Sequence, residues 1–317
     1  MSAAVLDLAL AALQAAVLVA AGPLFAGAIA TLKARAQMRR GAPPWQRWAD
    51  LARLWRKEAV VSEDASWLAR AGPYAVFGAS LAAAACVPVF AVRAPSPYAP
   101  DLVVTVALFA AVRVVQSLVA LEAGTAFGGM AASRHLALSA LGEPALVLAT
   151  LTLALSAGST DLAAISRAVA SAPHGWLAPS HLLALAALWL VTLSETGRVP
   201  VDNPATHLEL TMVHEGLTLE ASGRHLALLE WAAAVRQIAL FTLVATLFLP
   251  WGIALAPTPA ALATGAVAWA AKLALFAVVV AATESLTARL RLFRIPEFLG
   301  MAFLLALLAF ASDSLFR

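Results

Sequence analysis

The sequence predicts an all-α integral membrane protein with about eight transmembrane helices and further amphipathic helices on the cytoplasmic side. Hydrophobic residues make up 62% of the 317 residues and charged residues only 12%, whereas soluble domains carry about 25% charged residues. The hydrophobic residues fall in long runs. Because lipid leaves only the helix or the closed barrel as ways to satisfy the backbone, each run is expected to be helical. We expect a single membrane domain over residues 1–317.

Each predicted span is a run of apolar residues bounded by polar or charged ones, and the fifth run is the shortest. The eight spans are Leu6–Thr31, Pro73–Val92, Leu102–Ala123, Leu136–Ala157, His181–Ser194, Leu226–Leu249, Ala261–Thr283 and Pro296–Ser312. No Lys or Arg precedes Lys33, so the first span lacks the basic region of a signal peptide and is expected to be retained.

The placement of Lys and Arg predicts the orientation of the chain. Outside the spans, only Arg93, Arg167 and Arg317 fall on one side, and all other basic residues fall on the opposite side. Cytoplasmic loops carry the excess of Lys and Arg. The odd-numbered connections are therefore predicted to lie in the cytoplasm of a prokaryotic cytoplasmic (inner) membrane, with both termini on the outer side.

Residues 33–71 form a strongly basic connection between the first two spans. Within it, Pro44–Val60 places Trp and Leu residues at helical spacing, with Arg53 and Lys57 elsewhere on the helix. This pattern predicts an amphipathic helix that lies in the membrane interface. Such a helix is either a surface anchor or a platform on which a peripheral subunit docks, and the pattern alone leaves both open.

Residues 195–225 form a second cytoplasmic connection, which is rich in acidic residues. Pro200 and Pro204 each lack a backbone N–H and hold the preceding residue in extended conformation. Thr206 and Glu209 have the capping-box spacing, which predicts a short helix over Thr206–Glu220. Such a helix would be about 22 Å long, too short and too charged to cross a bilayer.

Several ionisable residues fall within the spans, where a charged side chain costs roughly 2.5–3.5 kcal/mol on insertion scales. Arg113 and Glu122 project from opposite faces of one helix, so Arg113 needs a partner from another helix. Glu143 precedes Pro144, which breaks a helical hydrogen bond and leaves a carbonyl that water can hydrate. Lys272 lies near mid-membrane, where structural and functional roles are equally open.

No metal or cofactor is expected in this chain. Cys86 is the single cysteine, so a disulfide within the chain or a cysteine-rich metal site is excluded. His207 and His214 lie seven residues apart without an adjacent third ligand, a pattern that more often belongs to a solvated helix surface. Nucleic acid is not an expected partner.

Four stretches resemble one family. They are SETGRVPVDNPATHLELTMVHEGLTLEASG (Ser194–Gly223), KARAQMRRGAPPWQRWADLARLWRKEAVVSED (Lys33–Asp64), LEAGTAFGGMAASRHLALSALGEPALVLA (Leu121–Ala149) and ESLTARLRLFRIPEFLG (Glu284–Gly300). They resemble the complex I subunit 1 family, which includes respiratory-chain NADH dehydrogenase subunit 1, and are most similar to its hydrogenase branch, the membrane subunits of energy-converting [NiFe]-hydrogenases and formate hydrogenlyase subunit 4.

The resemblance implies a non-catalytic membrane subunit of a formate-hydrogenlyase-like hydrogenase complex. Such a subunit docks the hydrogenase large and small subunits of a peripheral redox arm, which hold the Fe–S clusters and the NiFe centre, and couples their electron transfer to proton or sodium translocation with antiporter-like membrane subunits. The expected proton-pathway residues are Glu122, Glu143, Glu195, Asp202, Glu209, Glu215, Glu220, Glu230, Lys272 and Glu284. The expected structural or docking residues are Arg53, Lys57, Arg113, Arg134, Arg198, Pro200 and Pro204.

Two alternative functions remain at this point. The first is the quinone-site subunit of a complex-I-type oxidoreductase, although Leu32–Arg35 differs from the E-R-K-type motif of the quinone-reducing relatives. The second is an independent secondary ion transporter, which would require internal repeats and interrupted helices. No convincing repeat relates the two halves of the chain.

Overall fold

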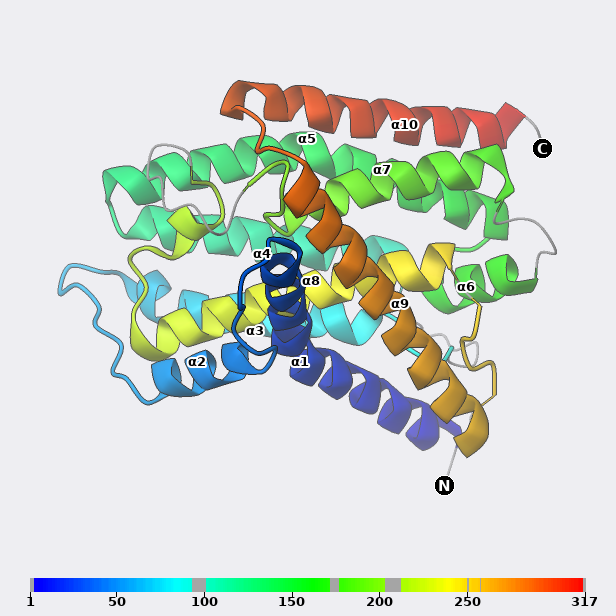
Figure 1. Cartoon of the computed structure of the whole chain (residues 1–317), viewed down its shortest axis with the longest axis horizontal. Coiled ribbons are helices and arrows are strands. Elements are labelled where there is room, and N and C mark those ends of the chain that lie inside the picture. The colour runs from blue at the N-terminus through cyan, green and yellow to red at the C-terminus, as the bar shows by residue number, and fades with distance from the viewer. Residues whose placement is uncertain are drawn as a thin grey trace.

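The computed structural model describes residues 3–92, 101–171, 177–202, 212–249, 251–256 and 258–315, and it is built of helices (Figure 1). The α-helices are α1 (Ala3–Ala36), α2 (Gln46–Trp55), α3 (Trp67–Cys86), α4 (Leu102–Glu122), α5 (Ala126–Ala157), α6 (Leu162–Ser171), α7 (Pro179–Glu195), α8 (Gly223–Phe248), α9 (Pro259–Leu286) and α10 (Ile295–Leu315). Two short 3₁₀ helices are η2 (Glu215–Thr218) and η3 (Leu292–Arg294). The described residues contain isolated β-bridges but no strand, which confirms the all-α prediction.

A helix occupies each of the eight predicted spans. Within the described residues, six helices are long and apolar enough to cross a membrane, namely α1, α4, α5, α8, α9 and α10 with η3. The remaining two spans correspond to α3 and to α7, which is shorter at 17 residues. The prediction of eight crossings is therefore supported for six helices and remains a prediction for α3 and α7.

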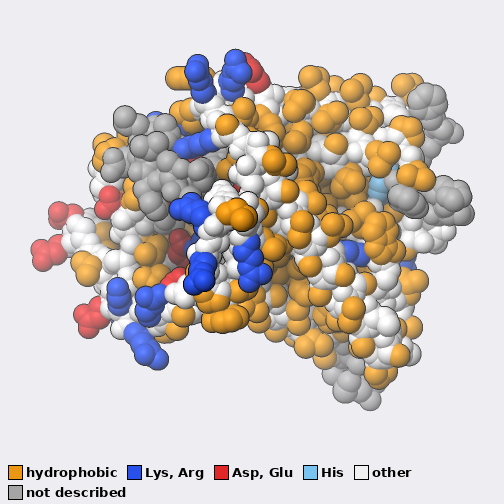
Figure 2. All heavy atoms as spheres, viewed as in Figure 1, with side chains coloured by type: hydrophobic (Ala, Val, Ile, Leu, Met, Phe, Trp, Pro, Cys, Tyr) orange, Lys and Arg blue, Asp and Glu red, His pale blue; other side chains and the backbone are white. Residues whose placement is uncertain are grey.

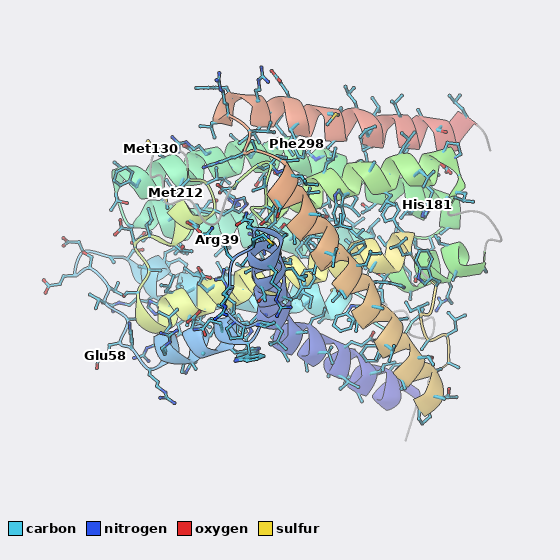
Figure 3. All side chains as sticks on the ribbon, in the orientation of Figure 1. Arg39, Glu58, Met130, His181, Met212 and Phe298 are labelled. Carbon is cyan, nitrogen blue, oxygen red and sulfur yellow. The ribbon has the colours of Figure 1, made fainter. Side chains whose placement is uncertain are left out.

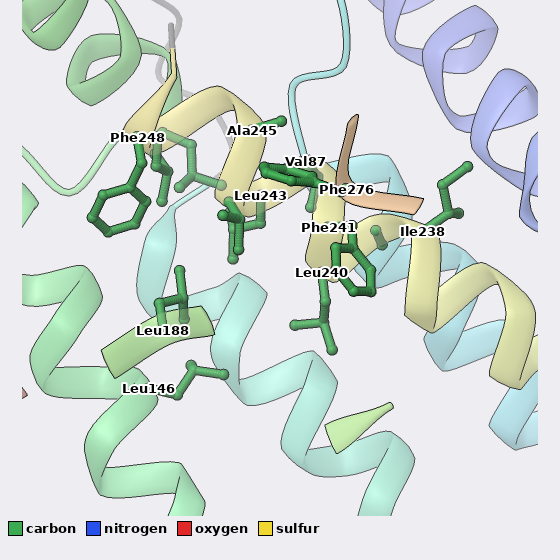
Figure 4. Close-up of a cluster of buried hydrophobic side chains, with 14 of the residues drawn as sticks. Val87, Leu146, Leu188, Ile238, Leu240, Phe241, Leu243, Ala245, Phe248 and Phe276 are labelled. Atoms are coloured by element: carbon green, nitrogen blue, oxygen red, sulfur yellow. The ribbon is translucent and has the colours of Figure 1, made fainter. Parts of the chain in front are cut away.

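Helix α8 lies at the centre of the bundle. Of its most apolar 18-residue stretch, 83% is buried within the chain, against 44% or less in the other five such helices. In Figure 1, α5, α7 and α10 run side by side, while α1 and α9 cross the bundle obliquely. The Phe241 ring of α8 contacts the rings of Phe25, Trp189 and Phe276 at centroid distances of 5.3, 5.6 and 6.0 Å. Figure 4 shows Phe241 and Phe276 among the buried side chains of this core. These contacts tie α1, α7 and α9 to the same helix.

The amphipathic helix of the basic connection is present but shorter than predicted, because only Gln46–Trp55 is helical. Leu51 is buried, and the Trp48 indole donates a hydrogen bond to the carbonyl of Ala20 at 3.2 Å and packs edge-on against Trp231. Trp55 is 53% exposed. The helix α2 is thus fixed to α1 and α8 by one face, and its other face is open.

Two segments differ from the sequence predictions. Helix α6 was not predicted, because its 10 residues are too few for a span; it packs on α8, where the Ser166 hydroxyl donates to the carbonyl of Thr246. The predicted helix over Thr206–Glu220 is wrong in its described part, in which only the short η2 is helical. A helix does not form here because Asp202 accepts hydrogen bonds from the backbone N–H groups of Val213 and His214. These two groups are then not available for helical hydrogen bonds.

Charged side chains are concentrated at one end of the molecule. On the face shown in Figure 2, Lys, Arg, Asp and Glu gather at the left, and the right-hand part is mainly hydrophobic. Figure 3 shows Arg39, Glu58, Met130 and Met212 at this end and His181 at the other. The first turn of α1 and the last turn of α10 lie at the right in Figure 1, opposite the charged end.

Candidate functional site

Arg113 of α4 is the centre of a buried ion-pair network within the bundle. Its side chain is only 2% exposed, with Nη2 3.2 Å from Oε2 of Glu143 and Nη1 2.9 Å from Oε2 of Glu195. Glu143 lies near the middle of α5, and Glu195 is the last residue of α7. The prediction that Arg113 takes its partners from other helices is confirmed.

The two carboxylates of this network have different surroundings. The Glu195 side chain is 6% exposed, whereas that of Glu143 is 40% exposed in the isolated chain. A single guanidinium therefore faces two carboxylates in a region that excludes most water. The two carboxylates therefore compete for the same guanidinium.

A second cluster is built around Glu284 near the end of α9. Its Oε2 is 2.9 Å from Nζ of Lys33 at the end of α1, and its Oε1 is 3.4 Å from Nη1 of Arg198, which follows α7. Arg198 also donates a hydrogen bond to Oε1 of Gln237 on α8 at 3.0 Å. Burial lowers the pKa of the Arg198 guanidinium, and the charge of Glu284 opposes that effect. One carboxylate here serves two cations.

A third cluster is centred on Asp202, which lies in the polar connection that follows α7. Its Oδ1 is 2.9 Å from Nη2 of Arg289, and its Oδ2 is 3.4 Å from Nδ1 of His214. Burial alone would raise the pKa of Asp202, but the hydrogen bonds from His214 and the charge of Arg289 hold it below its usual value. Asp202 is therefore an anion that fixes the connection to the segment between α9 and α10.

His214 also contacts a second imidazole. Its ring lies edge-on to that of His135 on α5, with a centroid distance of 5.3 Å and an interplanar angle of 82°. His135 is 2% exposed, and its Nδ1 lies 3.0 Å from the Ser117 hydroxyl of α4. A small cavity of about 10 Å³ adjoins both rings, and its wall is completed by polar and apolar neighbours: Leu138, Ser139, Ser194, Glu195 and Val213.

A larger cavity of about 640 Å³ lies between α2, α8 and the polar connection. Its wall includes apolar side chains of α2 and α8 (Leu51, Leu54, Leu226 and Leu229) and ionisable groups (Arg47, Asp50, Arg198, His214, Glu215, Glu230 and Arg236). Arg47 and Glu230 form a partly exposed ion pair at 3.4 Å, so the cavity reaches the surface. Arg236 is 4% exposed, and its Nε and Nη1 have no hydrogen-bond partner among the described residues.

The sequence profile of a family described as NADH dehydrogenase matches residues 8–312. The chain belongs to the NADH dehydrogenase family. It is 34% identical to hydrogenase-4 component C of Escherichia coli (strain K12) over 93% of this chain and 92% of that protein. It is 33% identical to formate hydrogenlyase subunit 4 of the same organism over 95% of this chain and 96% of that protein. Together with its apolar helices, this membership identifies the chain as a membrane protein.

The fold of this NADH dehydrogenase family member also occurs in a solved complex. The chain superposes with a TM-score of 0.81 on a chain in the membrane-bound sulfane sulfur reductase, an archaeal respiratory membrane complex. The match covers 97% of this chain and 99% of the other, at 20% sequence identity. At that identity, the similarity concerns the fold.

Several residues that the sequence placed in the proton pathway lie outside the three clusters of this family member. Glu122 accepts a hydrogen bond from the backbone N–H of Ser66 at the start of α3, which is a capping contact. Glu220 is exposed. Lys272 is buried, and its Nζ lies 5.8 Å from the ring centroid of Trp251 with no carboxylate within ion-pair distance among the described residues. Glu209, Pro204 and His207 lie outside the described residues.

The residues predicted for structure or docking have varied positions. Arg134 holds the polar connection by donating to the carbonyl of Met212 at 3.3 Å, and the carbonyl of Pro200 accepts from the backbone N–H of Leu290 at 2.9 Å. Arg53 pairs with Asp50 on the exposed side of α2, and Lys57 is exposed. Their role in docking remains a prediction.

The sequence did not predict several residues that belong to the ion-pair clusters or line the small cavity. These residues are Lys33, Gln237 and Arg289 in the clusters, and His135 and His214 in the cavity wall. The sequence pattern assigned His214 to a solvated helix surface. A usable signal was present, because His214 lies next to Glu215 in a connection that contains many acids. Among the described residues, no group of three or more His, Cys, Asp or Glu side chains could hold a metal ion.

Proposed function

We propose that this chain is the membrane subunit of a multisubunit energy-converting [NiFe]-hydrogenase of the formate-hydrogenlyase type. It docks the peripheral redox arm and couples the electron transfer in that arm to proton translocation. The observation that carries the proposal is the buried Arg113 with its two carboxylates, Glu143 and Glu195. The relatives named as a hydrogenase component and a formate hydrogenlyase subunit support the choice of complex.

The buried network suits proton transfer because its two carboxylates share the guanidinium of Arg113, while the charge of the buried Arg236 also acts on Glu195. Burial of an unpaired carboxylate is costly, and Arg113 offsets that cost for both groups at once. A proton that enters at Glu195 weakens its pairing with Arg113, which then interacts more strongly with Glu143. Movement of the guanidinium between the two groups thus transmits the arrival of a proton from α7 to α5.

The polar connection links this network to the cytoplasmic surface. Ser222 at its end accepts a hydrogen bond from the backbone N–H of Val60 and donates one to the Val60 carbonyl. A Cβ on Gly223 would collide with the carbonyl oxygen of Glu58, so the two segments touch through bare backbone. A redox arm that docks on Arg53 and Lys57 would therefore lie beside this backbone contact. Its movement could be passed on to the polar connection, which contains Asp202. The hydrogenase large and small subunits, with their Fe–S clusters and NiFe centre, are the expected docking partners.

The exposure of Glu143 supports the proposal that a second partner covers this side of α5. A carboxylate that faces lipid at membrane depth costs several kcal/mol, yet the Glu143 side chain is 40% exposed in the isolated chain. A neighbouring membrane subunit that covers this face removes the cost and receives the proton. We expect an antiporter-like subunit at this position.

A second candidate function, the quinone-site subunit of a complex-I-type oxidoreductase, is favoured by the larger cavity. Its volume of about 640 Å³ and its mixed apolar and polar wall fall within the usual range for small-molecule sites. Hydrogen evolution and menaquinone reduction by the purified complex distinguish the two. Hydrogen evolution without menaquinone reduction supports the hydrogenase, and the reverse result supports the quinone enzyme. An independent transporter predicts neither activity and no co-purifying redox subunits.

The coupling role is tested with Glu143→Gln in the complex purified through a tag on this chain and reconstituted into liposomes. Hydrogen evolution from reduced viologen and the accompanying pH change are recorded together, with Glu297→Gln, an exposed carboxylate at the start of α10, as the control. We expect Glu143→Gln to abolish proton movement while the control retains it. Unchanged proton movement in Glu143→Gln would remove this residue from the pathway. Repeating the assay with a sodium ionophore separates proton from sodium translocation.

The orientation belongs to the same proposal. We place the basic connection in the cytoplasm of a prokaryotic cytoplasmic membrane and both termini on the outer side, in agreement with the clustering of charges at one end (Figure 2). Single cysteines introduced at Arg39, an exposed residue of the basic connection, and at Asp7 in a Cys86→Ser background provide the test. Arg39→Cys should react with an impermeant maleimide only in inside-out vesicles, and Asp7→Cys only in right-side-out vesicles.

A further inference from the structure

His214 forms part of the wall of both cavities. It lines the larger cavity, which reaches the surface beside Arg47, and it lines the small cavity, whose wall also includes Glu195. Glu195 is in turn paired with Arg113. The imidazole of His214 therefore stands between a surface-connected space and the buried ion-pair network. Histidine is the side chain whose ordinary pKa lies nearest to neutral pH, so it exchanges protons readily there.

The surrounding structure holds the His214 ring in one position. Asp202 lies 3.4 Å from Nδ1 and also accepts from the backbone N–H of His214 at 3.1 Å. His135 packs edge-on against the ring from α5. On a third side, Gly197 has a φ of +61°, and a Cβ there would lie 2.9 Å from Cγ of His214. A side chain at position 197 would thus push the ring away, and the bare backbone leaves it room.

The small cavity provides the next step toward Glu195. Its volume of about 10 Å³ is close to the minimum for one water molecule. A buried water needs two to four polar partners, and the wall offers His135, Ser139, Ser194, Glu195 and His214. One water in this position connects the imidazole to the carboxylate without any movement of the backbone.

We propose that His214 passes protons from the larger cavity to Glu195 through a water molecule in the small cavity; this rests on the proposed function. With Nδ1–H directed at Asp202, the basic nitrogen of the neutral ring is Nε2. This nitrogen accepts a proton from water in the larger cavity and forms the imidazolium, while that water takes a replacement proton from the cytoplasm. The imidazolium then gives its Nε2 proton to the small-cavity water, and that water passes one of its own protons to the Glu195 carboxylate. His214 is then neutral again, with its remaining proton on Nδ1.

Charged groups of both signs surround His214. Asp202 stabilises the imidazolium, and Arg289 keeps Asp202 ionised. The other ionisable groups that face His214 across the two cavities or from the packed helices are His135, Arg134, Glu195, Glu215, Arg198, Arg236, Arg47, Asp50 and Glu230. This set contains both acids and bases.

Chemical rescue provides the test, in the reconstituted complex described above. In His214→Gly, we expect the initial rate of proton movement to fall about 10²-fold, which is a modest general acid–base contribution. Imidazole can enter through the larger cavity and should restore the rate with increasing concentration, whereas pyrazole, a ring of the same size but far lower basicity, should not. His225→Gly, at a histidine that packs against Tyr74 outside both cavities, should keep the normal rate.

The outcomes separate this proposal from the proposed function. Loss of proton movement in Glu143→Gln with a normal rate in His214→Gly would overturn the relay and leave the coupling role intact. Normal rates in both variants would overturn both. Equal rescue by imidazole and pyrazole would show that the ring fills space only and would also overturn the relay. If the complex with His214→Gly fails to assemble, His214→Gln replaces it in the assay, because glutamine is polar but does not take up or release a proton near neutral pH. Normal proton movement in His214→Gln would refute the relay.

Discussion

Removal of Arg113 should destabilise the chain through the carboxylate that it leaves behind. Arg113 and Glu195 are 2% and 6% exposed, and their charged atoms are 2.9 Å apart. Removing one partner of a buried ion pair typically costs about 3–5 kcal/mol, because the remaining charge is no longer compensated. Arg113→Met keeps a flexible apolar side chain and removes the charge, so we expect a loss of this size.

The assay is the apparent melting temperature of the detergent-purified chain. For a chain of this size, a loss of 1 kcal/mol lowers the melting temperature by about 2 °C, so Arg113→Met should melt roughly 6–10 °C below the wild type. Glu195→Gln, made alone, leaves Arg113 paired with Glu143 and should cost less. In the double variant, neither charge remains at this pair, and the melting temperature should recover toward that of Glu195→Gln.

The double-mutant cycle supplies the refutation. Residues in contact show coupling energies of about 0.5–3 kcal/mol, while independent sites add within a few tenths of a kcal/mol. If the losses of Arg113→Met and Glu195→Gln are simply additive, the two groups do not interact in the folded protein. In that case, the account of a shared guanidinium fails, and with it the suggested transfer between Glu195 and Glu143.

Two further predictions concern the polar connection. Because folding lowers the pKa of Asp202, its carboxylate stabilises the native state above the unfolded-state pKa of about 4, and this contribution disappears as the pH falls through the lower native value. The difference in melting temperature between wild type and Asp202→Asn should therefore be constant near pH 6 and shrink below about pH 4; a difference independent of pH would contradict it. Gly197→Ala should cost about 1–3 kcal/mol, because φ is +61° and the added Cβ meets the His214 ring. Gly78→Ala, at a helical glycine with open space around it, is the control, and equal effects of the two would show that position 197 carries no special constraint.

The sequence predicted the helices well wherever lipid imposes a simple rule. An apolar run that is long enough must be helical, so all eight predicted spans contain a helix. The rule says nothing about short segments, and α6 was missed because its 10 residues resemble a loop with some apolar positions. The predicted helix over Thr206–Glu220 was based on a capping-box pattern. In the structure, the backbone N–H groups of residues 213 and 214 instead donate hydrogen bonds to Asp202, and this longer-range interaction prevents the helix.

The candidate site was predictable in its residue types and not in its pairings. The cost of a buried charge identified Arg113 and Glu143, the family resemblance added Glu195, and helical geometry excluded Glu122 as the partner of Arg113. Which helices supply the partners depends on how the bundle packs, and no local pattern contains that information. Lys33 and Glu284 illustrate this, since they come from opposite parts of the chain and meet at 2.9 Å.

The three clusters differ in their balance of charge. In the Arg113 cluster, two carboxylates share one guanidinium, and the charge of Arg236 also acts on Glu195. The Glu284 cluster has two cations for one carboxylate and repels a further positive charge. Asp202 and Arg289 balance each other, so the state of His214 decides the sign of the third cluster. If protons pass from the larger cavity to the buried network as proposed, the charges of Lys33 and Arg198 would oppose their passage near Glu284, and His214 would be the titratable group beside the remaining route.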